Sequence, residues 1–222
     1  MAAFWQVSAQ PFSPNSTSPA PVTKPPIQET GPGKFQIGEV RLDKNKKSAS
    51  FGGHVNMSTG LVEYAVVGGN GKLHESLLAT KAAPYHIHLA MLLLSATNQS
   101  AKAQTGRPLK GHPINISVSW KNGDKERQVR LEDLICRDQP GKTAARGIWL
   151  YNGSRVIDGG FLAQRDESIV ALIEDPDALI NNPRPGRESD EIWFVNEKTV
   201  PSANTPVQIT FEVLSGLPNN HD

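Results

Sequence analysis

The residues best suited to chemistry gather between positions 60 and 97. His74 and Glu75 follow a glycine-rich turn, and His86 and His88 come further along the same stretch. Imidazole nitrogens and carboxylate oxygens bind zinc, nickel and copper in proteins. A metal site is therefore the sharpest chemical hypothesis for this chain, with His54 or His112 as further candidate ligands.

The spacing of these residues limits that hypothesis. A helix that begins at Pro84 would point His86 and His88 to nearly opposite sides, because residues two apart do not share a helix face. Neighbours such as His74 and Glu75 alternate faces on a strand. A metal site would therefore take one member of each pair, for example His74 with His88. In the alternative, one histidine hydrogen-bonds across a helix–sheet seam and the others face solvent.

Other chemistries have weaker support. Ser76 lies close to His74, but the chain has no Gly-x-Ser-x-Gly elbow that would make a serine nucleophile. Residues 68–71 lack the Lys-Ser/Thr of a phosphate loop and are typical of a hairpin turn. Residues 174–177 do not follow the calcium-loop pattern and favour a helix cap instead. We therefore expect no catalytic residue and no cofactor.

Composition excludes several classes of function. The 222 residues carry 23 Lys and Arg against 22 Asp and Glu, so no global field attracts nucleic acid or an anionic membrane. No apolar run approaches the ~20 residues of a membrane span. Cys136 is the only cysteine, which excludes an internal disulfide and a cysteine-based zinc site. We expect Cys136 to be a small buried side chain.

The first 33 residues differ from the rest. Residues 8–33 hold seven of the 17 prolines, together with many Ser and Thr. This composition predicts a disordered, extended tether over residues 1–33, on which Phe4 and Trp5 would dock onto the domain or a neighbouring copy. The N-terminus lacks the features of a signal peptide. Because tethers of this kind often precede exported domains, we predict an exported protein whose signal peptide is absent from this sequence.

The rest of the chain indicates a β-rich domain over residues 34–216, followed by a flexible tail at 217–222. Apolar residues alternate with polar ones over 114–120 and 207–213, as in half-buried antiparallel strands. Asn122-Gly123 is typical of a hairpin turn, and residues 61–67 and 72–79 form a second predicted hairpin. Residues 84–97 predict one buried helix. The pattern favours an antiparallel, immunoglobulin-like β-sandwich with this helix packed on a sheet.

Several short motifs resemble the YdjY-type domain of bacterial exported proteins. They are Glu63-Tyr64, Lys72-x-His74-Glu75-Ser76, Pro84-Tyr85-x-Ile87-His88-Leu89, Ile148-Trp149-x-Tyr151-x-Gly153-Ser154, Asp175-Pro176-Asp177 and Pro206-Val207. The resemblance covers about residues 35 to 214 and implies no activity. A ferredoxin-like role given to some relatives needs clustered cysteines, which one cysteine excludes. In its length and its tethered domain, the chain also resembles an immunoglobulin-like surface protein of a type IV pilus-associated locus in a mucin-degrading gut bacterium.

The expected function is therefore interaction rather than catalysis. We predict a structural or adhesive protein of the cell envelope, in the periplasm or at the outer membrane and cell surface, and related to a pilus. Its expected partners are proteins or further copies of itself, as in a homo-oligomer, and not nucleic acid. The alternative is a periplasmic metal- or small-molecule-binding domain, or an enzyme, that uses His74 and His88, with Glu75 and His86 as the other candidate ligands.

Overall fold

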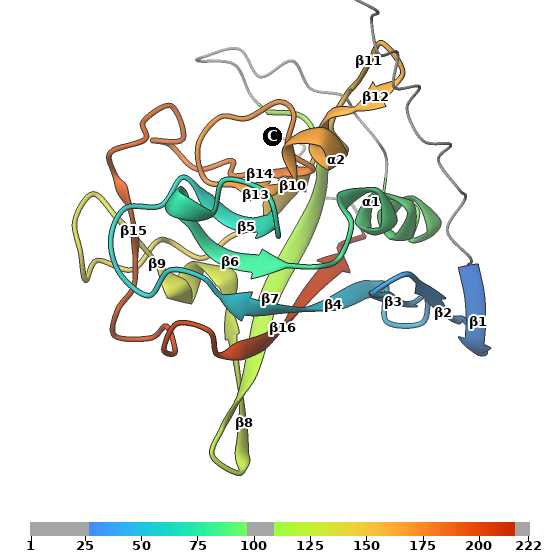
Figure 1. Cartoon of the computed structure of the whole chain (residues 1–222), viewed down its shortest axis with the longest axis horizontal. Helices are drawn as coiled ribbons and strands as arrows, with labels where there is room; N and C mark the ends of the chain where they lie inside the picture. The colour runs from blue at the N-terminus through green and yellow to red at the C-terminus, as the bar shows by residue number, and fades with distance from the viewer. Residues whose placement is uncertain (1–26, 97–108, 216–222) are drawn as a thin grey trace, which may run out of the picture.

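The computed structural model describes residues 27–96 and 109–215 and contains a closed β-barrel. A 12-stranded sheet runs through the domain, and eight of its strands close into the barrel (Figure 1). In order round the wall these are β4 (Ser48–Val55), β16 (Pro206–Val213), β7 (His112–Asn122), β10 (Trp149–Tyr151), β14 (Ile180–Asn181), β13 (Ser168–Ala171), β5 (Tyr64–Gly68) and β6 (Ser76–Thr80).

The predicted immunoglobulin-like sandwich is therefore wrong, although the predicted β-rich class is correct. Both architectures bury alternate residues of antiparallel strands, so the alternation in the sequence cannot distinguish them. The distinction depends on the seam between β4 and β6, where His54 pairs with Ala79 and Val55 pairs with Leu78. Thr80 strengthens this seam because its hydroxyl donates a hydrogen bond of 2.6 Å to the Gly52 carbonyl.

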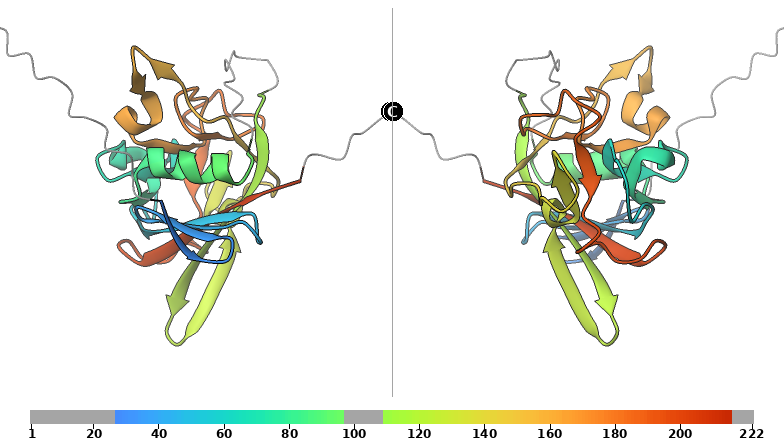
Figure 2. Two further views of the ribbon diagram at one scale, coloured as in Figure 1. Left: turned by 90° about the vertical axis from the view of Figure 1, so that its right-hand side faces the viewer. Right: turned by 90° about the vertical axis from the view of Figure 1, so that its left-hand side faces the viewer.

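The strands outside the barrel extend its sheet. The ribbon of β1 (Ile27–Gly31), β2 (Lys34–Ile37) and β3 (Val40–Asp43) joins the barrel through β3, which pairs with the first half of β4. Strand β8 (Lys125–Arg130) pairs with β7 to form a hairpin that projects from the barrel (Figures 1 and 2). This hairpin confirms the prediction made from Asn122-Gly123.

Alternating side chains separate the inside of the barrel from its outside on one half of the wall. Ile116 and Val118 of β7 and Ile209 and Phe211 of β16 are buried in the core. Phe51 of β4 meets Phe211 edge to face, with ring centroids 5.2 Å apart. The intervening residues of these three strands are polar or glycine and point outward, apart from Pro206 and the buried Pro113. We call this half of the wall the open side.

The other half of the wall is buried on both faces, and we call it the covered side. Every residue of β5, β6 and β13 is buried. Outside the wall, Tyr64 and Val67 pack with Ala171 and Ala178 in a second, smaller core. Burial on both faces requires apolar residues at successive positions, which explains why these strands read as continuous apolar runs.

The covered side also corrects the predicted hairpin of residues 61–67 and 72–79. Strands β5 and β6 are neighbours, but they run parallel, with Tyr64 opposite Ser76 and Val67 opposite Ala79. The chain returns from the end of β5 to the start of β6 through the 3-10 helix η1 (Leu73–Glu75). A glycine-rich turn alone therefore does not establish a hairpin here.

Two α-helices occur in the described residues, where the sequence predicts one. Helix α1 (Pro84–Leu93) begins at Pro84 as predicted, ends before the predicted position 97, and packs against β2, β3 and β4. The short helix α2 (Leu162–Asp166) contacts α1 and follows the small hairpin of β11 (Val156–Ile157) and β12 (Gly160–Phe161). A further helical segment, the 3-10 helix η2 (Leu131–Leu134), leads into β9 (Ile135–Arg137), which pairs with β15 (Trp193–Val195).

Some predictions concern the ends of the chain. Strand β1 lies within the segment predicted as a tether, whereas residues 1–26, Phe4 and Trp5 among them, and the predicted tail at 217–222 lie outside the described residues. Within 27–96 and 109–215, no helix is both long enough and apolar enough to cross a bilayer. Cys136 is buried, as predicted.

The β4–β6 seam leads to a testable prediction about two adjacent glycines. A Cβ atom at Gly53 would lie 2.8 Å from the Ala79 carbonyl oxygen and 3.1 Å from Ile209 Cδ1, whereas a Cβ at Gly52 would meet nothing within 4 Å. We expect Gly53→Ala to lower the free energy of unfolding by about 1–3 kcal/mol through overpacking. Gly52→Ala is the matched control and should cost little. Urea unfolding measures both, and equal losses would contradict the role of the seam.

Candidate functional site

His74 and Glu75 lie together on η1, on the covered side of the barrel. The His74 side chain is 81% exposed, and its Nε2 is 3.4 Å from a carboxylate oxygen of Glu75. Lys72 Nζ approaches the other Glu75 oxygen at 3.8 Å. The 3-10 turn thus brings the two neighbours together, whereas on a strand they would point to opposite faces.

Lys72 connects η1 to the barrel wall. Its ammonium donates a 2.7 Å hydrogen bond to the Tyr64 hydroxyl, which donates in turn to Asp175 at 3.1 Å. Burial, followed by the nearby Asp175 carboxylate, raises the pKa of Tyr64 well above its usual value. Tyr64 therefore stays protonated and works as a connector between η1 and the 174–177 segment, not as a base.

Glu63 adds another carboxylate next to this group. Burial and then the neighbouring Glu75 carboxylate raise the pKa of Glu63. We call Glu63, Tyr64, Lys72, Glu75 and Asp175 the Lys72 cluster. Ser76 does not act as a nucleophile here, because it is fully buried and its hydroxyl donates to the Lys72 carbonyl.

Asp175 also has a local structural role. One of its carboxylate oxygens accepts a 2.8 Å hydrogen bond from the Asp177 backbone N–H, as expected for an aspartate that stabilises a turn. Its other oxygen accepts the Tyr64 hydroxyl. Asp177 is taken up by Arg155, whose Nε donates to it at 2.6 Å. The predicted helix cap is therefore wrong, because this segment forms a turn that leads into β14 without a helix, although both carboxylates are engaged within the fold.

His86 and His88 have different environments on α1. A Cβ on Gly38, in the turn between β2 and β3, would collide with the His86 ring. His86 is thus fitted against a glycine with φ of +55°, and burial lowers its pKa. His88 faces the barrel wall instead. The helix therefore separates the two imidazoles, as the spacing predicts.

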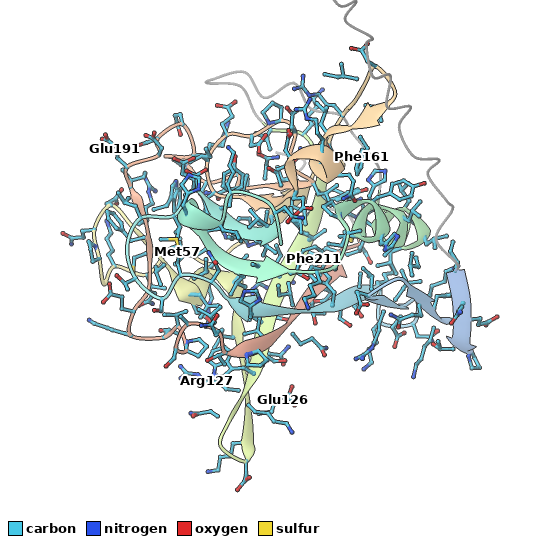
Figure 3. The ribbon with its side chains drawn as sticks, in the orientation of Figure 1. Met57, Glu126, Arg127, Phe161, Glu191 and Phe211 are labelled. Atoms are coloured by element: carbon cyan, nitrogen blue, oxygen red, sulfur yellow. The ribbon has the colours of Figure 1, made fainter. Side chains whose placement is uncertain are left out.

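His88 is held at the seam between the helix and the barrel. Its Nδ1 lies 2.8 Å from the hydroxyl of Tyr151 on β10, and its ring centroid lies 4.8 Å from that of Phe161. Figure 3 shows Phe161 beside α2, above α1. His88 is only 8% exposed, and burial lowers its pKa from 6.5 to about 4. His88 is therefore neutral at pH 7 and shares one hydrogen bond with the Tyr151 hydroxyl, whose direction depends on the imidazole tautomer.

The predicted pairing of His74 with His88 finds no support in these contacts. His74 is exposed beside Glu75, whereas His88 is enclosed by Tyr151 and Phe161. Across the part of the chain that the structure describes, no three His, Cys, Asp or Glu side chains form a group suited to a metal ion. Of the other histidines, His112 Nε2 lies 2.9 Å from the Leu214 carbonyl oxygen.

One buried ionic group was not predicted from the sequence. Glu132 of η2 is fully buried, and its carboxylate accepts hydrogen bonds from Arg184 at 2.8 Å, Arg130 at 3.1 Å and the Gly147 backbone N–H at 3.0 Å. Arg184 also stacks over Trp149, 4.8 Å from the ring centroid. Nothing in the local sequence distinguishes Glu132 from an exposed turn residue. Arg184 is 52 residues away along the chain, and Arg130 belongs to the preceding strand.

Two hollows lie elsewhere, on the open side. A hollow of about 710 Å³, the Gly52 hollow, is lined by Ser50, Gly52, Ser119 and Gln208 among others. A second hollow of about 600 Å³, the Thr210 hollow, is lined by Asn115, Ser117, Thr210 and Glu212 among others. Both fall within the range of ligand sites in proteins. The polar half of the alternation in 114–120 and 207–213 was the only sequence signal for them.

The family model described as the YdjY domain matches residues 40–212, which is well over half of the chain. No curated protein and no solved structure matches.

His88 makes stability depend on pH. The unfolded chain binds a proton at this residue below its ordinary pKa of 6.5, whereas the folded chain does so only near pH 4. The stabilisation is therefore complete above pH 6.5 and is lost as the pH falls towards 4, at up to about 1.4 kcal/mol per pH unit. We expect His88→Gln to flatten the pH dependence of the free energy of unfolding in this range. His74→Gln, which removes an exposed imidazole, is the control, and an unchanged slope in His88→Gln would refute the assignment.

Glu132 yields a second prediction. Glu132→Gln keeps the shape of the side chain but leaves the buried Arg184 without its countercharge. We expect a loss of about 3–5 kcal/mol in the free energy of unfolding, as for other broken buried ion pairs. Asp138→Asn is the matched control, because Asp138 pairs with Lys142 at the surface and exposed pairs contribute little. Similar losses in the two variants would be inconsistent with a structural role for Glu132.

Proposed function

The chain belongs to the YdjY domain family, and from this premise we propose that it is a recognition and assembly protein of the cell envelope that works by binding rather than by catalysis. The open side of the barrel would be its binding surface. The covered side, with the Lys72 cluster, would hold the barrel wall together.

One observation carries this proposal. Outward side chains of β4, β16 and β7, which the core does not use, line much of the Gly52 and Thr210 hollows. The candidate reactive side chains are instead engaged in internal contacts, since His88 is hydrogen-bonded to Tyr151 and Lys72 to Tyr64. A binding surface separated from His88 and the Lys72 cluster favours recognition over acid–base chemistry.

The setting that we propose follows the resemblance found in the sequence. The protein would be exported and would work in the periplasm or at the cell surface, associated with the outer membrane and with a type IV pilus. Its partners there would be envelope components or further copies of itself. The Pro-rich segment that precedes β1 would give the domain reach from an attachment point.

A first test separates this proposal from its rival, a periplasmic metal- or small-molecule-binding domain centred on His74 and His88. We expect elemental analysis of the purified protein to find no stoichiometric metal. We also expect zinc, nickel and copper to leave the thermal unfolding temperature unchanged, because a ligand of the folded state alone would raise it. Stoichiometric metal that is lost in His74→Ala would establish the rival function.

A second test addresses location and assembly. Fractionation of the source bacterium, followed by detection with an antibody, should find the protein in the envelope fractions. Light scattering of the purified chain should then report whether it forms oligomers. Recovery of the protein mainly from the cytosol would contradict the envelope role, whatever its oligomeric state.

A further inference from the structure

Strand pairing aligns hydroxyl and amide side chains across the open side of the barrel. Thr210 of β16 lies opposite Ser50 of β4 on one side and opposite Ser117 of β7 on the other. Gln208 lies opposite Ser119 in the next row, and Glu212 lies opposite Asn115. We call the following residues the hydroxyl–amide face: Ser50, Asn115, Ser117, Ser119, Gln208 and Thr210.

The two hollows lie next to each other on this face, and we call them together the groove. Ser50 lines the Gly52 hollow and Thr210 lines the Thr210 hollow, yet these two residues are direct cross-strand partners. Strand β16 contributes lining residues from Pro206 to Glu212, which at ~3.3 Å per residue is about 20 Å. Such a length suits a chain of several linked units better than a single small molecule.

The groove offers short polar side chains on a floor that is otherwise backbone. Gly52 leaves its side-chain position open, since nothing lies within 4 Å of where a Cβ would be. The hairpin of β7 and β8 stands at one edge and contributes Asp124 and Glu126, while Glu39 and Arg41 line the opposite edge. A ligand on this floor would meet hydroxyl and amide groups, each of which both donates and accepts hydrogen bonds.

Charge restricts the class of ligand. Five basic and five acidic residues line the two hollows, so no net field favours an anion or a cation. Two of the arginines are already engaged, because Arg130 pairs with Glu132 and Arg146 pairs with Asp133. A neutral ligand rich in hydroxyl groups is the best match, because it loses no charge–solvent interactions on binding.

A peptide fits this groove less well. Peptides that add to a sheet need a free strand edge, or pockets for apolar side chains. The central strand β16 has β4 on one side and β7 on the other, which uses its backbone hydrogen bonds. The apolar residues that line the Gly52 hollow, such as Phe51 and Trp120, are buried beneath the floor.

We propose that the hydroxyl–amide face binds a neutral oligosaccharide that lies along β16. This inference rests on the proposed function, since it names the class of ligand for the same open side. Ser50, Ser117 and Thr210 would bind sugar hydroxyl groups at the centre of the groove. Gln208 and Asn115 would bind neighbouring units on either side.

The test uses the full chain and a panel of defined oligosaccharides. The neutral probes are oligomers of glucose, xylose and N-acetylglucosamine of increasing length, and the acidic probes are oligogalacturonides. We expect at least one neutral series to bind, with affinity that rises with length. The double variant Ser50→Ala/Thr210→Val should weaken that binding about tenfold or more, because it removes two hydroxyl groups at nearly constant shape.

Controls decide what the result means. Ser202→Ala removes an exposed hydroxyl outside the groove and should leave binding unchanged. Thermal unfolding checks that each variant is folded, and Gln208→Ala, at an exposed position, replaces the double variant if that protein is unstable. Absence of neutral binding, binding of acidic probes alone, or binding that ignores both groove variants would overturn the inference. An envelope location without bound metal would leave the proposed function standing in each of these cases.

Discussion

The fold depends on how the two halves of β4 pair with different strands along the same edge. One edge of β4 pairs with β16, and the other pairs first with β3 and then with β6. The short contact with β6 closes the barrel, and the contact with β3 sends a ribbon away from it. Helix α1 follows directly after β6 and packs against β2, β3 and β4, so it fills the angle where ribbon and barrel diverge. The burial of His88 is a consequence, because the helix lies against the barrel at this point.

Closure also creates two unlike halves of the wall. On the covered side, β5, β6 and β13 carry layers on both faces, and polar groups there must find partners within the protein. The Lys72 cluster and the hydrogen bond between His88 and Tyr151 meet this need. On the open side, β4, β16 and β7 have only one buried face. Most of their outward residues are not buried, which is why the proposed binding surface lies there.

The sequence predicts the features that depend on neighbouring residues. The alternation in β7 and β16, the hairpin at Asn122-Gly123 and the start of α1 at Pro84 are all correct. Barrel closure and the parallel pairing of β5 with β6 are not predictable in this way, because they depend on which distant strands meet. In the candidate functional site, too, the sequence predicts only what depends on neighbouring residues. Spacing separates His86 from His88, but no local signal reveals that Glu132 is buried between two arginines.

Stability alone does not account for the composition of the hydroxyl–amide face. Solvent-facing positions of a sheet accept many polar residues, and each substitution usually changes the free energy of unfolding by no more than about 0.5 kcal/mol. Long charged side chains would keep the protein soluble equally well. Along the middle of β4, β16 and β7 the outward residues are instead uncharged and, apart from Gln208, short, from Ser50 and Gly52 to Thr210 and Ser117. Short side chains keep the groove open and bring a ligand close to the sheet. A requirement for contact with a hydroxyl-rich ligand explains this composition, whereas folding leaves it undetermined.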